Sequence, residues 1–210
     1  HSLDGVKLCA DLGMDRVVLS RELSRDAIEH ICINSPIEIE TFVHGAMCMC
    51  YSGQCYFSGV IGGRSGNRGL CAEPCRLKYG WNGKANEYPL SLKDMSLAGH
   101  LKQLDKMGVA CLKIEGRMKR PEYVAIVTRI YAQAIREKRD PTAEEMEQLR
   151  QAFSREGFSD GYFMDQKGKA MFGTRQEEEF PRELFAQARA TFENGENRKE
   201  PIRMFANVRS

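Results

Sequence analysis

Long hydrophobic runs are missing from this 210-residue chain, because no stretch approaches the roughly 20 apolar residues that a membrane-spanning helix requires. The N-terminal residues also lack the basic start and the apolar core of a signal peptide. These absences exclude a transmembrane protein and give no sign of export. We therefore expect a cytoplasmic protein that has no membrane partner.

Several familiar catalytic and metal motifs are absent as well. The sequence has no His-Glu-x-x-His helix and no Gly-x-Ser-x-Gly turn, which speaks against conventional zinc and serine hydrolases. It also lacks Cys-x-x-Cys knuckles and the Cys-x-x-x-Cys-x-x-Cys spacing of radical SAM proteins. The chain has four histidines: His1, His30, His44 and His100.

Cysteine, by contrast, is abundant, and five of the eight cysteines fall in residues 38–79. Cys48 and Cys55 are seven residues apart, Cys71 and Cys75 are four apart, and the glycines between the pairs allow the chain to fold them together. A chain of this length builds a core without disulfides. Without a sign of export, metal ligation or free thiols are the better interpretation.

Four converging thiolates suit either zinc or an iron–sulfur cluster. The loose spacing favours a cluster, with zinc as the alternative. Cys50 or Cys111 could replace one of the four ligands. Cys9 and Cys32 lie on apolar helical stripes and are expected to be free core thiols.

Hydrophobic periodicity predicts an α/β fold in which strands alternate with helices. Because helical connections join successive strands, we expect parallel strands whose carboxyl ends share one functional face, in a closed barrel or an open sheet. The expected strands are residues 16–20, 37–43, 88–92 and 110–116, and the expected helices are residues 3–12, one capped by Ser24, one capped by Asp94 or Ser96, and one that starts at Pro121.

The pattern changes after residue 140. Thr142 and Glu145 predict a capping box, and a Gly- and aromatic-rich segment follows that resembles a compact loop or hairpin. The tail from residue 174 is polar, with a weak helix near residues 182–192, and we expect few contacts from it. Because the chain starts within a helical pattern, we also expect it to be part of a larger fold.

Charge is unevenly distributed along the chain. Residues 64–84 hold five basic side chains and one acid, and residues 113–139 hold eight basic side chains and three acids. An anionic ligand is attracted to such regions, although a charge run is often only a solvated face. The candidate anion contacts are Arg64, Arg68, Arg76, Arg117, Lys119 and Arg120.

Two further side chains are candidate catalytic groups. His44 lies near a strand end beside the cysteine loop, where it would act as a general base or a ligand, or simply pack. Glu115 lies at the end of another strand, where it would transfer a proton or pair with Arg117.

The segments "ETFVHGAMCMCYSGQCYFS", "GRSGNRGLCAEPCRLKY", "LKDM" and "LKIEGRMKRPEYV" resemble the signature of the peptidase U32 family over residues 38–136. The resemblance implies the C-terminal half of a parallel TIM-type β/α barrel over residues 1–140, with the cysteine-rich loop at 45–80. A small helical and loop extension at 141–175 and a linker or domain start at 176–210 would follow. The extension is similar to that of the ribosomal RNA cytidine hydroxylase branch.

The resemblance further implies a four-iron four-sulfur cluster held by Cys48, Cys55, Cys71 and Cys75, although Cys50 departs from the usual small or apolar residue. It implies hydroxylation of a base in ribosomal or transfer RNA. The alternatives are a collagenase-like peptidase and a cluster-bearing scaffold without activity. The missing N-terminal half-barrel is the expected intramolecular partner, so we expect the isolated chain to be inactive.

Overall fold

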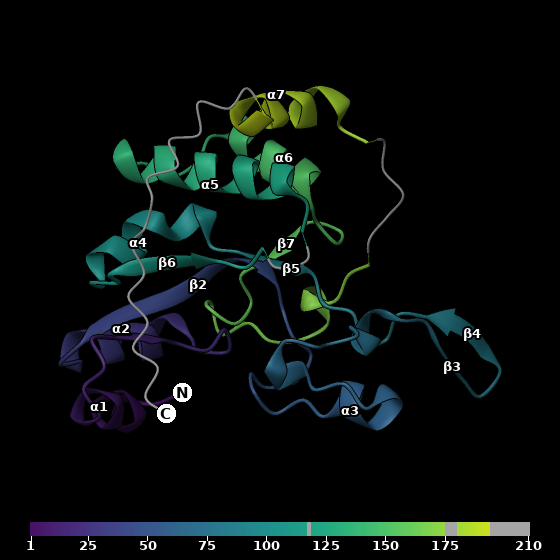
Figure 1. Ribbon diagram of the computed structural model, residues 1–210, viewed down its shortest axis with the longest axis horizontal. Helices are drawn as coiled ribbons and strands as arrows, with labels where there is room; N and C mark the ends of the chain where they lie inside the picture. The colour runs from purple at the N-terminus through teal and green to yellow at the C-terminus, as the bar shows by residue number, and fades with distance from the viewer. Residues whose placement is uncertain (117–118, 175–179, 194–210) are drawn as a thin grey trace, which may run out of the picture.

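The computed structural model describes residues 1–116, 119–174 and 180–193, apart from the side chains of residues 81 and 84–86. Over these residues the chain forms a mixed α/β structure around a five-stranded sheet, with a separate two-stranded hairpin (Figure 1). The predicted α/β class is thus confirmed.

The first half of the sheet follows the expected alternation of helices and strands. The chain begins with α1 (Leu3–Asp11), β1 (Arg16–Val18), α2 (Arg25–Asn34) and β2 (Glu38–Ala46). β1 and β6 (Cys111–Ile114) both pair with β2 in parallel. Ile39, Thr41 and Val43 of β2 are buried, whereas Glu38 is exposed, so the alternation in the sequence turns one strand face to the core.

The remaining strands differ from the prediction. Residues 88–92 do not form a strand; Leu92 makes only an isolated bridge to Phe172. Instead, β5 (Asp94–Ser96) pairs antiparallel with β2, and β7 (Phe158–Ser159) pairs parallel with β5. The prediction that all strands are parallel is therefore wrong.

The physical reason lies in a buried ion pair. Asp94 is 1% exposed, and Arg155 donates to its carboxylate at 2.7 Å. A buried carboxylate is tolerated only with such a partner, and the partner lies far along the chain. For the same reason Asp94 does not cap the next helix: α4 (Leu101–Lys106) follows a 3₁₀ turn at Ala98–His100 and has no side-chain cap.

The other predicted helix starts are confirmed. The Ser24 hydroxyl accepts the Ala27 N–H at 3.4 Å at the start of α2, and Pro121 opens α5 (Pro121–Arg136). Thr142 and Glu145 form the capping box of α6 (Ala143–Ala152). Arg139 also binds the Glu145 carboxylate and, with the cap, lowers the pKa of Glu145 to about 2.

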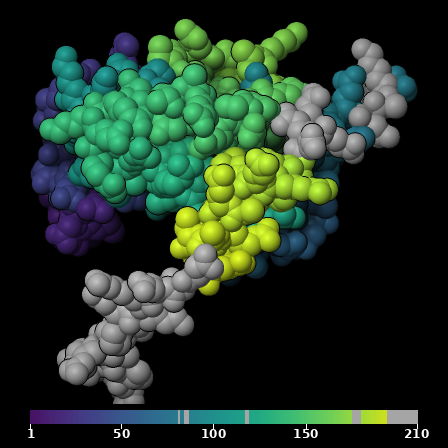
Figure 2. All heavy atoms as spheres, turned by 90° about the horizontal axis from the view of Figure 1, so that it is seen from above, coloured from purple at the N-terminus to yellow at the C-terminus, as the bar shows by residue number. Residues whose placement is uncertain are grey.

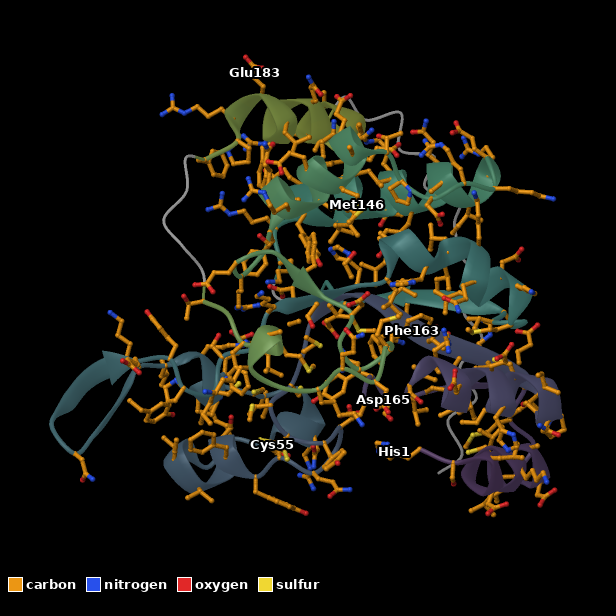
Figure 3. All side chains as sticks on the ribbon, turned by 180° about the vertical axis from the view of Figure 1, so that it is seen from behind. His1, Cys55, Met146, Phe163, Asp165 and Glu183 are labelled. Carbon is orange, nitrogen blue, oxygen red and sulfur yellow. The ribbon has the colours of Figure 1, made fainter. Side chains whose placement is uncertain are left out.

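The segment after α6 belongs to the main body of the fold rather than to a separate hairpin. It supplies β7 and a 3₁₀ turn at Lys169–Met171. Phe163, labelled in Figure 3, is 2% exposed, and its carbonyl accepts the Arg25 N–H of α2 at 2.8 Å.

The expectation of few contacts beyond residue 174 is wrong for α7 (Arg182–Glu193). Figure 2 shows this helix lying across α5 and α6. Phe185 and Ala188 are buried there, and Arg189 binds Glu122 of α5 at 2.9 Å. The weak amphipathic pattern is stabilised by tertiary packing.

None of the helices among the described residues has both the length and the apolar character needed to cross a bilayer.

Phe185→Ala tests the packing of α7. Because this side chain is 4% exposed, we expect the substitution to lower the free energy of unfolding by about 3 kcal/mol. Phe180→Ala is the matched control, since Phe180 is 43% exposed and its ring contacts that of Phe185; it should lower stability by about 1 kcal/mol or less. Urea unfolding measures both. Equal losses would contradict the docking of α7.

Candidate metal centre

The cysteine loop leaves the sheet at the carboxyl end of β2, as the sequence predicts. Gly45 has φ +116°, and a Cβ there would lie 2.6 Å from the Glu115 carbonyl oxygen. The Glu115 N–H in turn donates to the His44 carbonyl at 2.9 Å. Glycine at this position therefore allows the ends of β2 and β6 to meet.

Short elements build the loop beyond β2. It contains α3 (Phe57–Gly62), 3₁₀ turns at Gly66–Arg68 and Pro74–Arg76, and the hairpin of β3 (Tyr79–Trp81) and β4 (Lys84–Glu87). This region projects from the α/β body in Figure 1, and Figure 3 shows Cys55 on the side opposite the helix that holds Glu183.

Neighbouring thiols of the loop affect the ionisation of Cys48 and Cys75. Cys48 interacts with Cys71 and Cys75, and Cys75 interacts with Cys71 and Cys55. Burial, reinforced by the neighbouring thiols, raises the pKa of Cys48 and Cys75. These are the four cysteines chosen from the sequence, and their role as a common ligand set stays a prediction.

The two rival cysteines are placed differently. Cys111 lies on β6, where its charge interacts with Glu40, Arg16 and Lys113 rather than with the loop thiols. Cys50 follows Cys48 in the loop and is half-buried, but it is not among the charges that shift the pKa of Cys48 or Cys75.

Hydrogen-bond donors point at one of the loop sulfurs. The Ser58 hydroxyl donates to Cys71 Sγ at 3.7 Å, and the Glu73 N–H donates to the same atom at 3.3 Å. Gly66 faces Cys71, since a Cβ on this glycine would lie 3.7 Å from the Cys71 Cβ. N–H and O–H donors of this kind stabilise a thiolate and tune a metal-bound sulfur.

The choice between a single zinc ion and a cluster stays a prediction from the sequence. Sulfurs around one zinc ion lie about 3.8 Å apart, given tetrahedral bonds of about 2.3 Å. Among the described residues, no group of three His, Cys, Asp or Glu side chains is gathered closely enough to hold a single ion. The four loop cysteines match the number and type of ligands of an iron–sulfur cluster.

Sequence reasoning missed two residues that follow β1. Arg21 stacks its guanidinium 3.7 Å from the centre of the Phe42 ring and pairs with Glu115 at 3.2 Å. Its charge also opposes the rise in the pKa of Cys48. Arg21, which follows β1, thus contacts the middle of β2 and the residue after β6.

The second missed residue is Glu22. One of its carboxylate oxygens accepts both the N–H and the hydroxyl of Ser52, at 2.6 and 2.9 Å. The other oxygen is buried and has no hydrogen-bond partner within the part of the chain that the structure describes. Glu22 therefore fixes the turn between Cys48 and Cys55. The available signal was a charged pair directly after the carboxyl end of a strand, where α/β proteins place functional groups.

The six predicted anion contacts have different surroundings. Arg64 and Arg68 are exposed on the loop, and Arg117 lies outside the described residues. The Lys119 ammonium lies 2.9 Å from the centre of the Phe153 ring, and the Arg120 guanidinium lies 5.6 Å from the centre of the Phe180 ring. Their role as anion contacts stays a prediction.

Arg76 is directed into the protein, where its guanidinium holds neighbouring segments together. It donates to the carbonyls of Met47 and Leu92 and to the Ser91 hydroxyl. Burial lowers the pKa of its guanidinium. Arg76 ties the end of the cysteine loop to the start of the same loop and to the segment that leads into β5.

His44 lies inside the fold. It is 1% exposed, its Nδ1 is 3.2 Å from the Tyr131 hydroxyl, and rings of Tyr123, Tyr131 and Phe158 surround it. Burial and the charge of Lys119 lower the pKa of His44 to about 3. The imidazole is therefore neutral at pH 7 and enclosed.

Comparison with known proteins gives a consistent family match. The model of peptidase family U32 matches residues 1–172. The chain is 39% identical over 160 residues to the 23S rRNA 5-hydroxycytidine C2501 synthase of Escherichia coli, a match that covers 73% of this chain and 24% of that protein. No solved structure matches at a comparable level of significance.

Other curated relatives have different names. The chain is 38% identical over 178 residues to a collagenase of Porphyromonas gingivalis, with 73% of this chain and 43% of that protein covered. It is 40% identical over 142 residues to tRNA hydroxylation protein P1 of Bacillus subtilis, with 62% and 34% covered. The chain thus spans less than half of the length of each of these relatives.

The buried His44 predicts acid sensitivity. Its pKa is lower in the folded state than the ordinary 6.5, so between about pH 6.5 and 3 the unfolded chain binds a proton that the folded chain does not. Stability contributed by neutral His44 is present above pH 6.5 and is lost as pH falls, by up to about 1.4 kcal/mol per pH unit. Urea unfolding from pH 7 to pH 4 measures this slope.

His44→Gln should flatten the pH dependence while lowering stability at pH 7. The exposed His30, changed to Gln, is the control and should leave the slope unchanged. An unaltered slope in His44→Gln would show that His44 titrates normally.

Proposed function

The chain belongs to peptidase family U32, and on this basis we propose that it is part of an iron–sulfur-dependent enzyme that hydroxylates a base in ribosomal or transfer RNA. The supporting observation is that the loop after the carboxyl end of β2 carries all four cysteines, and that two hydrogen-bond donors are directed at Cys71. Relatives named for RNA hydroxylation match the same part of the chain.

In this proposal Cys48, Cys55, Cys71 and Cys75 hold a four-iron four-sulfur cluster. When bound, such a cluster supplies one-electron chemistry at the strand ends. The protein's own part is to hold the thiols: Glu22 fixes the turn before Cys55, and Arg76, next to Cys75, donates to the carbonyl of Met47, next to Cys48. Zinc in the same site is the alternative.

The substrate class follows from charge and from the relatives. Arg64, Arg68 and Lys78 are exposed on the loop, with Glu73 as its acidic side chain, so the loop surface attracts phosphates. Arg21 and Glu115 are paired at the strand ends, where Glu115 is placed to transfer a proton. We place this activity in the cytoplasm, where RNA is modified.

A peptidase is the second candidate, because one relative with 38% identity is named a collagenase. A cluster-bearing scaffold without activity is the third. The metal and RNA measurements below separate the three.

The metal is tested by anaerobic purification of the full-length protein. We expect about four irons per chain and a broad visible absorbance band. Cys71→Ala should lose the band and most of the iron, because it removes the sulfur that two donors address. Cys111→Ala, which removes the thiol on β6, should keep both. Zinc without iron in the wild type, or equal loss in the two variants, would contradict the assignment.

The reaction is tested by mass spectrometry of nucleosides from total RNA. A strain that lacks the gene should lose one hydroxylated nucleoside in ribosomal or transfer RNA. The wild-type gene and the Cys111→Ala gene should restore it, and the Cys71→Ala gene should not. An unchanged RNA profile together with loss of collagen cleavage would favour the peptidase, and no change in either would favour the scaffold.

A further inference from the structure

A small pocket opens beside Cys55. Its volume is about 230 Å³, and its side chains include the aromatic Tyr56, the cationic Arg64 and the amide Asn67, with Gly59 and Gly63 in the wall. Pockets that enclose a whole small ligand usually measure roughly 300–1,000 Å³. This pocket has room for a single planar ring, and glycines leave its wall open to close approach.

Tyr56 presents an unusual aromatic surface. Its side chain is 75% exposed, although it directly follows a half-buried cysteine. A large ring that borders a pocket and does not contribute to the core is available for stacking. Proteins that bind unpaired nucleotides use exposed aromatic rings in this way.

The polar groups of the pocket are held by the backbone. Arg64 Nε donates to the Leu70 carbonyl at 2.9 Å, and Asn67 Nδ2 donates to the Gly53 carbonyl at 2.9 Å. Each side chain is therefore anchored through one nitrogen. The terminal N–H groups of Arg64 and the Oδ1 atom of Asn67 make no hydrogen bond with the described part of the chain, so they can donate to and accept from a ligand.

The surroundings of the pocket are positively charged. Arg64 lines the pocket, and Arg68, next to the lining residue Asn67, is exposed, whereas Arg76 is turned inward. A nucleotide combines a planar ring with an anionic phosphate, and this pocket combines a stacking ring with cations. An acidic peptide would satisfy the cations and leave the pocket without a planar ring.

We propose that this pocket binds one unpaired base of single-stranded RNA, stacked on Tyr56, with Asn67 at the base edge and Arg64 at the adjoining phosphate. The inference rests on the proposed function, because it identifies which structural class of RNA the site accepts. A base within a duplex is already stacked on both faces and cannot enter without leaving the helix. The pocket therefore selects single strands or loops.

The test measures binding of a fluorescein-labelled single-stranded RNA oligonucleotide to full-length protein purified anaerobically, by fluorescence anisotropy. Tyr56→Ala should weaken binding about 5- to 150-fold, which corresponds to the roughly 1–3 kcal/mol of one stacked base. Tyr56→Phe keeps the ring and should bind like the wild type. The matched control is Tyr51→Ala, since Tyr51 is 63% exposed on the same loop and lies outside the pocket.

Salt and strand dependence provide the second readout. Arg64→Ala should reduce the slope of log affinity against log salt by about 0.7, the effect of one phosphate contact in a single strand. The same RNA annealed to its complement should bind more weakly to the wild type and should not distinguish Tyr56→Ala from it.

The following outcomes would overturn the inference. Equal binding of Tyr56→Ala and wild type would place RNA elsewhere, and wild-type preference for the duplex would exclude an unpaired base. Tyr56-dependent binding of a collagen peptide without RNA binding would assign the pocket to a protein. The proposed function is tested separately by the nucleoside profile. If the deletion strain loses a hydroxylated nucleoside but Tyr56→Ala binds RNA normally, the pocket assignment alone is overturned.

Discussion

The close approach of Gly45 to the backbone of Glu115 is the constraint on which the site depends. A side chain at Gly45 would overlap the Glu115 carbonyl, and the resulting separation would break the bond from the Glu115 N–H to the His44 carbonyl. With the ends of β2 and β6 together, Glu115 lies within reach of Arg21 and the cysteine loop starts beside both. The geometry of the loop is thus set by two strands rather than by the loop itself.

Buried charges then join this strand end to the rest of the molecule. Asp94 enters the sheet opposite Ala46 and binds Arg155, which belongs to the segment after α6. Desolvation raises the pKa of Asp94, while the neighbouring cations Arg155, Lys119 and Arg76 oppose that rise. Replacing either Asp94 or Arg155 by a neutral residue would leave the other as an uncompensated buried charge. The extension is therefore an integral part of the site's support.

The sequence allowed prediction of what local chemistry determines. Helix starts at Ser24, Pro121 and Thr142 could be predicted because a cap involves neighbours three residues apart, and the four loop thiols stood out by composition. β5 could not be predicted, because the buried Asp94 depends on Arg155, which lies 61 residues away in the sequence. α7 could not be predicted to dock, since Phe185 stabilises it only through packing against the rest of the fold. Arg21 was missed because its stacking on Phe42 requires β1 and β2 to be adjacent.

The hydrogen bond from Arg76 to the Met47 carbonyl closes a ring of chain whose ends are 29 residues apart. Closing a flexible loop of this length lowers chain entropy by an amount worth on the order of 3 kcal/mol. Because the polypeptide itself closes the ring, a ligand that binds within this loop need not supply the free energy of bringing its two ends together.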